Sequence, residues 1–174
     1  MRMKEDHMLN GQLKPGYNIQ VGTENNFVIG YDVFPNPTDT RTFIPHLENV
    51  QNRLKCKFKT VIADAGYGSE ENYDYLEEKE ITGIVKYPSY EKETKRSFKK
   101  KIFNAENWKY DAEQKEYTCP CGNPVPYKKT VTKKNESGYM QTYEVYRCDN
   151  CEGCPFRALC TKSEYGRMVQ RNEH

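Results

Sequence analysis

Residues 61–73 read Val61-Ile62-Ala63-Asp64-Ala65-Gly66-Tyr67-Gly68-Ser69-Glu70-Glu71-Asn72-Tyr73. The apolar start of this stretch is typical of a short buried strand in a parallel sheet. The two glycines favour a sharp turn, where backbone angles closed to other residues are needed. Ser69 is a suitable helix N-cap, and the two glutamates after it suit the positive end of the helix dipole. The stretch therefore predicts a strand, a turn and a helix, in that order.

This interpretation places Asp64 at the carboxyl end of a strand. In open α/β sheets, binding sites are built at that edge. A carboxylate held there on rigid backbone is well placed to bind a hard cation such as Mg²⁺. The alternative is a turn-forming Asp that bonds its own backbone. On these residues alone, both interpretations stay open.

The chain before this stretch predicts a β-hairpin and a helix. Residues 17–21 alternate, with Tyr17, Ile19 and Val21 opposite polar neighbours, which is typical of a half-buried strand. A turn at 24–26 and a second strand over 27–34 complete the hairpin.

The predicted helix that follows has one apolar face, and Thr42 is its expected N-cap because proline at position 45 belongs in a first turn. That face is formed by Phe43, Leu47, Val50 and Leu54. The helix after Ser69 should run to about residue 80, and a last strand should cover 82–87.

The resulting order is strand, strand, helix, strand, helix, strand. We expect an α/β fold in which a hairpin precedes a right-handed crossover, giving a mixed sheet. The order is that of a ribonuclease-H-like sheet without its first strand. Asp32 lies inside the second strand and Asp6 in irregular chain, so neither is a convincing partner for Asp64.

Composition and charge narrow the function. The chain has 174 residues, of which 36% are hydrophobic, and its mean hydropathy is −1.01. Residues 1–85 carry a net charge of −4 and residues 86–174 one of +6, so the second half attracts a polyanion more strongly.

No apolar run approaches the ~20 residues of a membrane span. The charged start lacks the apolar core of a signal peptide, so we expect a cytoplasmic protein and no membrane partner.

A basic run with one aromatic residue lies near the middle of the chain. Its cations are candidates for DNA phosphate contacts, and a solvated linker is the alternative. These residues are Lys95, Arg96, Lys99, Lys100 and Lys101.

Six cysteines follow within a short, strand-rich segment that predicts small β-hairpins. In a cytoplasmic chain, clustered thiols indicate metal before disulfides. The six are Cys119, Cys121, Cys148, Cys151, Cys154 and Cys160. Four thiolates suffice for structural Zn²⁺ or for an iron–sulfur cluster, and the spacing does not choose between these metals.

The ligand set also stays open. Cys119, Cys121, Cys148 and Cys151 make one reasonable set, and the other two could replace members of it or complete another cluster. Cys56 stands apart and is expected to be a buried or idle thiol. His7 and His46 are expected at the surface or in packing roles.

Four motifs together resemble one family. They are Lys14-Pro15-Gly16-Tyr17-Asn18-Ile19-Gln20, the segment from Ala63 to Tyr73, Tyr117-Thr118-Cys119-Pro120-Cys121-Gly122, and the later cysteine array. On these residues the chain resembles an internal piece of a bacterial insertion-sequence transposase of the DDE type, from the branch with a cysteine-rich insertion.

The resemblance implies DNA transposition. Asp64 corresponds to the second acid of a catalytic triad of carboxylates that hold two Mg²⁺ ions for strand cleavage and transfer. It implies transposon-end DNA as a partner and possible self-association as a transposase oligomer. The implied organisation is a partial ribonuclease-H-like catalytic domain over 1–88, a basic linker over 89–107 and a cysteine-rich, metal-binding insertion over 108–174.

Two departures from the family pattern lead us to expect an incomplete, inactive fragment. The first acid should lie upstream of Met1 and the third on a downstream helix, and Glu164 and Glu173 are only formal candidates for the third. The alternative functions are a zinc-stabilised DNA-binding module without catalysis and an iron–sulfur nuclease.

Overall fold

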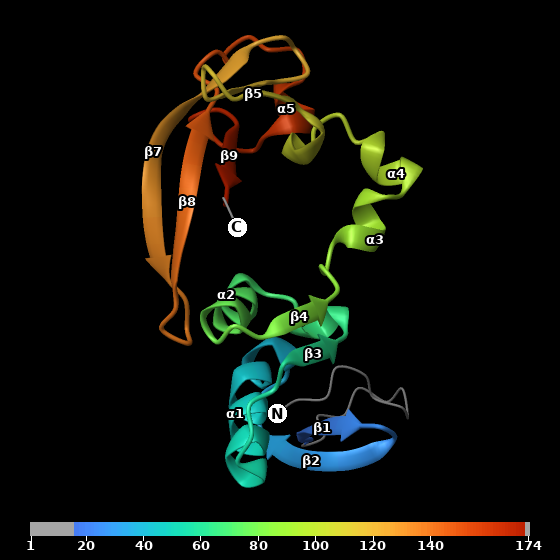
Figure 1. Ribbon diagram of the computed structural model, residues 1–174. Coiled ribbons are helices and arrows are strands. Elements are labelled where there is room, and N and C mark those ends of the chain that lie inside the picture. The colour runs from blue at the N-terminus through green and yellow to red at the C-terminus, as the bar shows by residue number, and fades with distance from the viewer. Residues whose placement is uncertain (1–15, 173–174) are drawn as a thin grey trace. The chain divides into compact units, whose positions relative to one another are not determined.

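The computed structural model describes residues 16–172 (Figure 1). The expectations for Asp6, His7, Glu173 and the start of the Lys14 motif lie outside this range. The chain divides into two compact units, one ending at Tyr90 and the other beginning at Glu91. Both mix helices and strands.

The first unit begins with the expected hairpin. Strand β1 (Asn18–Glu24) pairs antiparallel with β2 (Phe27–Phe34), with a register shift between Gly22 and Thr23. The two loop residues, Asn25 and Asn26, have φ angles of 49° and 67°. Positive φ at both positions suits the twist of a two-residue hairpin loop, and asparagine tolerates it well.

A second small sheet follows. Strand β3 (Thr60–Ala63) pairs in parallel with β4 (Thr82–Val85). Between them lie the short 3₁₀ helix η2 (Ala65–Tyr67) and helix α2 (Glu70–Glu78). Among the described residues no backbone pairing joins this sheet to the hairpin, so two separate sheets stand where we expected one mixed sheet.

Helix α1 (Phe43–Leu54) follows the short 3₁₀ helix η1 (Asp39–Arg41). Thr42 occupies the expected N-cap position, but its hydroxyl donates to the Asp39 carbonyl at 2.9 Å instead of capping α1. Three of the four predicted face residues are buried, whereas Leu54 is 44% exposed. Ser69 caps α2 as expected, since its Oγ accepts the Asn72 N–H at 3.3 Å.

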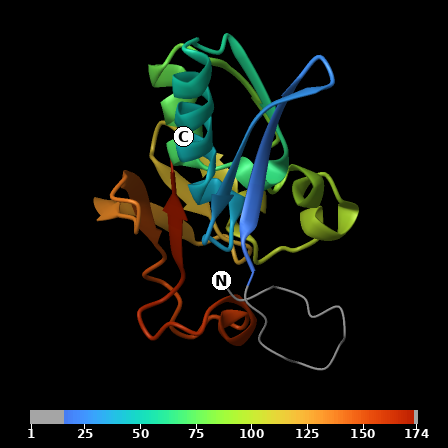
Figure 2. The same ribbon diagram turned by 90° about the horizontal axis from the view of Figure 1, so that it is seen from below.

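Each sheet has one glycine that lets a helix side chain approach its backbone. A Cβ built on Gly30 of β2 would lie 2.7 Å from Val50 Cγ2 of α1, and one on Gly83 of β4 would lie 2.6 Å from Leu76 Cδ1 of α2. Figures 1 and 2 show α1 lying beside β2. The missing side chains let the helices pack directly on the two sheets. Because the core is close-packed, these positions have no room for an added methyl group.

The hairpin turns its polar side inward, which is the reverse of our expectation. Tyr17, Ile19 and Val21 are 70%, 62% and 52% exposed, whereas Gln20 is 2% exposed. The alternation predicts the strand correctly, but it does not say which face of the strand is buried. Gln20 can be buried because the polar atoms of its side-chain amide are hydrogen-bonded.

The second unit begins with short helices and continues as one five-stranded antiparallel meander, in place of separate small hairpins. Its first element is α3 (Tyr90–Glu93), which begins at the last residue of the first unit. The others are α4 (Arg96–Lys99), η3 (Ala105–Asn107), β5 (Lys109–Asp111), β6 (Glu116–Thr118), β7 (Pro124–Lys134), β8 (Met140–Arg147), α5 (Arg157–Cys160) and β9 (Met168–Arg171).

Tyrosines fill much of this unit's core. Tyr146 of β8 is fully buried, and its ring meets those of Tyr117 and Tyr127 edge-on, with centroids 5.0 and 5.9 Å apart. Its hydroxyl donates to Glu144 Oε2 at 2.5 Å, so the polar tip is satisfied while the ring is buried. Burial and the neighbouring Glu144 carboxylate raise the pKa of Tyr146.

Gly30→Ala is expected to destabilise the first unit by about 1–3 kcal/mol, because the new methyl group would overlap Val50 and force α1 away from β2. Urea unfolding followed by circular dichroism measures the change. Gly22→Ala is the matched control: Gly22 lies directly opposite Gly30 in the hairpin, and its added Cβ would have no neighbour nearer than 3.4 Å. Equal stability of the two variants would contradict this packing account.

Candidate cation site and cysteine cluster

Asp64 follows β3 directly and caps η2. Its Oδ1 accepts the Gly66 N–H at 2.7 Å, and its side chain is exposed. The local turn interaction that we considered as an alternative is therefore present. It uses one oxygen of a carboxylate that remains open to solvent, so it does not prevent cation binding.

Asp39 of η1 lies against the same turn. A Cβ built on Gly66 would lie 2.9 Å from Asp39 Oδ2 and 3.0 Å from Asp64 Oδ1. The two carboxylates thus approach one point, although 24 intervening residues separate them in the sequence. Sequence reasoning missed Asp39, because its nearness to Asp64 depends on how the two 3₁₀ helices pack.

The glycines of this turn are needed for space. Gly68 has an ordinary φ of −64°, and neither it nor Gly66 has the positive φ that the sequence suggested. A Cβ on Gly68 would lie 2.6 Å from Pro88 Cδ and 2.7 Å from the Tyr73 hydroxyl. An added Cβ would therefore overlap the Pro88 ring at position 68, and at position 66 it would require the Asp39 carboxylate to shift.

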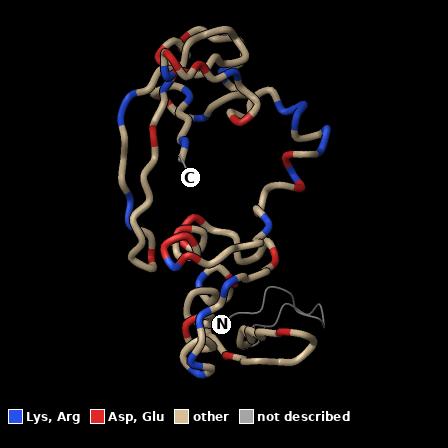
Figure 3. The backbone as a smooth tube through the Cα atoms, viewed as in Figure 1, with Lys and Arg blue, Asp and Glu red and all other residues tan. Residues whose placement is uncertain are grey.

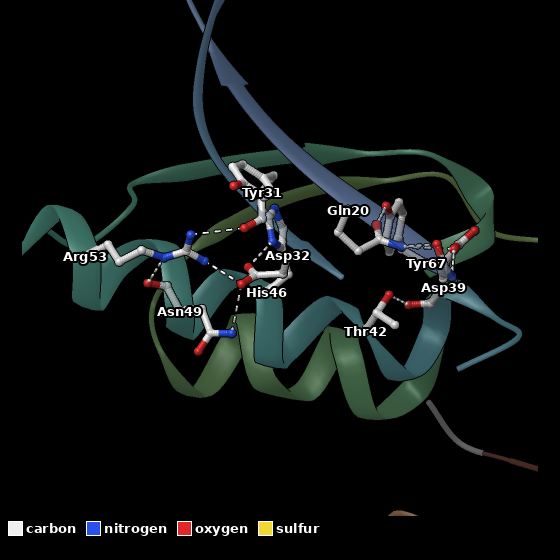
Figure 4. Close-up of polar contacts among 10 residues, drawn as sticks. Gln20, Tyr31, Asp32, Asp39, Thr42, His46, Asn49, Arg53 and Tyr67 are labelled. Atoms are coloured by element: carbon white, nitrogen blue, oxygen red, sulfur yellow. Dashed lines mark hydrogen bonds and ion pairs between the residues drawn. The ribbon is translucent and has the colours of Figure 1, made fainter. Parts of the chain in front are cut away.

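A hydrogen-bonded network links η1 to η2 (Figure 4). Asp39 Oδ1 accepts from Asn18 Nδ2 at 2.7 Å and from Gln20 Nε2 at 3.2 Å. The Tyr67 hydroxyl donates to Gln20 Oε1. Buried Asn72 adds a second link, since its Nδ2 donates to the Thr40 carbonyl at 3.0 Å and the Tyr67 carbonyl at 2.7 Å.

The negative charge of this site affects the pKa of Tyr67. Burial raises the pKa of its phenol first, and the negative charges of Asp39 and then Asp64 raise it further. The ring packs against Phe43, with centroids 5.4 Å apart. Tyr67 thus stays protonated at neutral pH and can donate to Gln20.

Asp32, which the sequence does not favour as a partner of Asp64, belongs to a different cluster. Its carboxylate accepts from His46 Nδ1 at 2.7 Å and from Arg53 at 2.5 Å (Figure 4). Arg53 also donates to the Tyr31 carbonyl at 3.0 Å. This cluster fastens β2 to α1, so His46 has the packing role that we expected.

The six clustered cysteines line one small cavity in the second unit. Cys148 is buried, and Cys119, Cys151 and Cys160 pack against the same core. Cys121 lies at the surface, with its Sγ 3.1 Å from Cys154 Sγ. Cys56, in the first unit, is exposed.

The thiols influence one another's ionisation. The hydrogen bond between Cys121 and Cys154 raises the pKa of Cys121 to about 11 and lowers that of Cys154. Burial, then the hydrogen bond with Cys151, raises the pKa of Cys148 to about 12. Burial likewise raises the pKa of Cys160. A metal ion bound here would have to displace several protons.

Backbone geometry supports the cysteine segments. Gly122, with φ +80°, closes a turn in which its N–H donates to the Cys119 carbonyl at 2.8 Å. The Arg167 N–H donates to Cys151 Sγ at 3.3 Å. Nevertheless, within residues 16–172 no group of three or more His, Cys, Asp or Glu side chains is arranged to hold a metal ion.

The basic run forms α4 and the residues around it, where Lys and Arg positions follow one another closely along the backbone (Figure 3). Its five cations are exposed. Asn107 Nδ2 donates to the carbonyls of Phe98 and Lys101 at 2.9 and 3.1 Å. The run is therefore a short helix whose C-terminal end is held by the hydrogen bonds of Asn107. Glu164, a formal candidate for the third acid, is exposed in the second unit outside any helix.

Comparison with known families now identifies the class of protein. The family profile described as "Transposase DDE domain" matches residues 2–148, which include Asp64 and the first three clustered cysteines. The chain therefore belongs to the DDE transposase family. At the family level this means DNA transposition, DNA as a partner and Mg²⁺ as the usual metal. Neither curated proteins nor solved structures gave a match.

None of the helices over residues 16–172 combines the length and apolarity required to cross a bilayer.

Asp39→Asn is expected to lower the pKa of Tyr67, because it removes a negative charge that disfavours the phenolate. The titration can be followed by NMR of ¹³C-tyrosine, with Tyr67→Phe assigning the signal. Glu77→Gln, at an exposed position of α2, is the control and should leave this pKa unchanged. An unshifted Tyr67 in Asp39→Asn would show that the carboxylate does not act on the phenol.

Proposed function

We propose that this chain takes part in Mg²⁺-dependent DNA strand cleavage and transfer, with Asp64 as a ligand of the catalytic cation. The observation that carries the proposal is the position of Asp64. It is an exposed carboxylate at the carboxyl end of β3, within the segment that the family profile matches. Hard oxygen ligands of this kind suit Mg²⁺.

The surrounding residues prepare this carboxylate. The Gly66 N–H holds Asp64 Oδ1, and Asp39 Oδ2 adds negative charge beside it. Bound Mg²⁺ would activate water or a DNA 3′-hydroxyl and stabilise the leaving oxygen. The protein's own part is to fix the ligand on a short, closely packed turn.

Catalysis needs more carboxylates than these two. A two-metal site relies on a cluster of acids for its affinity, and residues 16–172 bring no third metal-binding group to Asp64. We infer that the remaining acids come from outside these residues or from another chain. The 174-residue chain alone is then inactive in strand cleavage.

DNA contact is assigned to the exposed cations of the basic run around α4. Phosphate contacts by lysine and arginine release counterions, so binding should weaken steeply with salt. Asn107 orders the backbone at the end of this helix, which reduces the backbone entropy lost on binding.

Zinc is the metal that we propose for the cysteine cluster, with a structural role. The donor chemistry fits, because tetrahedral Zn²⁺ is commonly held by four thiolates. The thiols line one cavity but must rearrange to become ligands, because among residues 16–172 no group of three or more is arranged to hold a metal ion. An iron–sulfur cluster is the other metal centre that these donors would accept, and its brown colour would distinguish it from colourless zinc.

A second candidate function is a zinc-stabilised DNA-binding module without catalysis. The gathering of all six thiols at one cavity favours it, because such a centre could stabilise the second unit whether or not the chain cleaves DNA.

Asp64→Asn in the assembled transposase is expected to reduce strand cleavage at least about a hundredfold, since even changes in the outer shell of a metal site cost 10–100-fold. DNA binding, measured by fluorescence anisotropy, should be almost unchanged. Asp74→Asn on α2 is the control. Normal cleavage by Asp64→Asn would exclude the catalytic role and support the DNA-binding module.

Removal of metal by a strong chelator is expected to unfold the segment from about 108 to 161, because small metal centres couple binding to folding. Hydrogen exchange measures this: amides of β7 and β8 should lose protection, while those of α1 keep it. Elemental analysis before and after treatment identifies the metal. Unchanged exchange in β7 and β8 after verified metal loss would contradict a structural role.

A further inference from the structure

The buried amide of Gln20 is unusual for its place. It lies on β1 with 2% of its surface exposed, between apolar neighbours that face outward. Burying an amide costs free energy unless its donors and acceptor are all paired. Here its Nε2 donates to Asn18 Oδ1 at 2.8 Å and to Asp39 Oδ1 at 3.2 Å, and its Oε1 accepts from Tyr67.

These partners belong to three separate segments. Asn18 is on the hairpin, Asp39 is on η1, and Tyr67 ends η2. An apolar side chain would fill the same space without joining them. The amide therefore connects the hairpin and η1 to the turn that follows Asp64 (Figure 4).

Tyr67 transmits this constraint to Asp64. Its backbone N–H donates to the Asp64 carbonyl at 3.3 Å, and its own carbonyl accepts from Asn72. Its ring is held against Phe43, and its hydroxyl by Gln20. The turn is thus held through the backbone and through the far end of a side chain.

The Asp39 carboxylate also packs against the turn, next to Gly66. Gln20 and Asn18 hold its Oδ1, which leaves Oδ2 directed at Gly66, where an added Cβ would lie only 2.9 Å from it. If Asp39 moved, the space that defines the Asp64 turn would change.

We propose that Gln20 is a positioning residue for Asp64, acting through Tyr67 and Asp39. The inference rests on the proposed role of Asp64 as a cation ligand. Metal ligands must be held within about 0.5 Å of their working position by neighbours whose own side chains are locked. Asp64 is exposed, and among residues 16–172 its side chain bonds only the nearby Gly66 N–H, so its position depends on the turn that Gln20 fixes.

The decisive variant is Gln20→Leu, which keeps the volume and removes the hydrogen bonds. In the assembled transposase, the Mg²⁺ concentration for half-maximal strand cleavage should rise about tenfold, as for other outer-shell changes at metal sites. The rate at saturating Mg²⁺ should change far less. Gln51→Leu is the matched control, because the Gln51 side chain is also hydrogen-bonded in the same unit, its Oε1 accepting from the Phe58 N–H at 3.1 Å.

A second measurement needs no catalysis. Mn²⁺ added to the 174-residue chain should broaden the NMR signal of the Gly66 amide, which bonds the Asp64 carboxylate. Gln20→Leu should require about tenfold more Mn²⁺ for the same broadening. Asp64→Asn should abolish the broadening, and Gln51→Leu should leave it unchanged.

The outcomes separate the two proposals. If Gln20→Leu matches the unsubstituted chain while Asp64→Asn abolishes broadening, the positioning role is wrong and the role of Asp64 stands. If Asp64→Asn leaves the broadening unchanged, the proposed cation role of Asp64 is wrong. Should Gln20→Leu fail to fold, Tyr67→Phe replaces it, because it removes the hydroxyl and keeps the ring on Phe43. An unchanged Mg²⁺ requirement in Tyr67→Phe would overturn the inference.

Discussion

The hydrogen bonds of one buried amide, that of Gln20, hold the halves of the first unit together. The hairpin and the parallel pair share no backbone ladder, so their alignment depends on side chains and on the helices that cover them. Gln20 reaches both η1 and η2, and Asn72 makes a parallel connection through backbone carbonyls. Polar networks of this kind specify one arrangement, because a partly formed network leaves buried groups unpaired.

Local patterns in the sequence predicted most of the elements. The spacing of Phe43, Leu47 and Val50 located α1, and Ser69 with its following glutamates located the start of α2. The motif around Asp64 and the cysteine array led to the family that the profile comparison identifies. Predictions from these features are confirmed because helix capping, helical periodicity and motif chemistry depend on residues close together in the sequence.

What the sequence concealed depends on packing between distant segments. Alternation along β1 showed two faces, but the buried face proved to be the polar one, because Gln20 finds partners from η1 and η2. Asp39 follows a proline-rich loop and gave no signal of its nearness to Asp64. The glycines at 66 and 68 were recognised as special for the wrong reason, since they serve close packing rather than unusual backbone angles.

The outward apolar face of the hairpin has a consequence for handling the protein. The band of large, water-exposed side chains consists of Tyr17 just before β1, Ile19 and Val21 on β1, and Tyr31 and Val33 on β2. Attraction between such bands grows as water is warmed from the cold, and sulfate strengthens it. Dilute, chilled and sulfate-free solutions should therefore keep the chains monomeric, whereas high protein concentration or high sulfate concentration should make them associate.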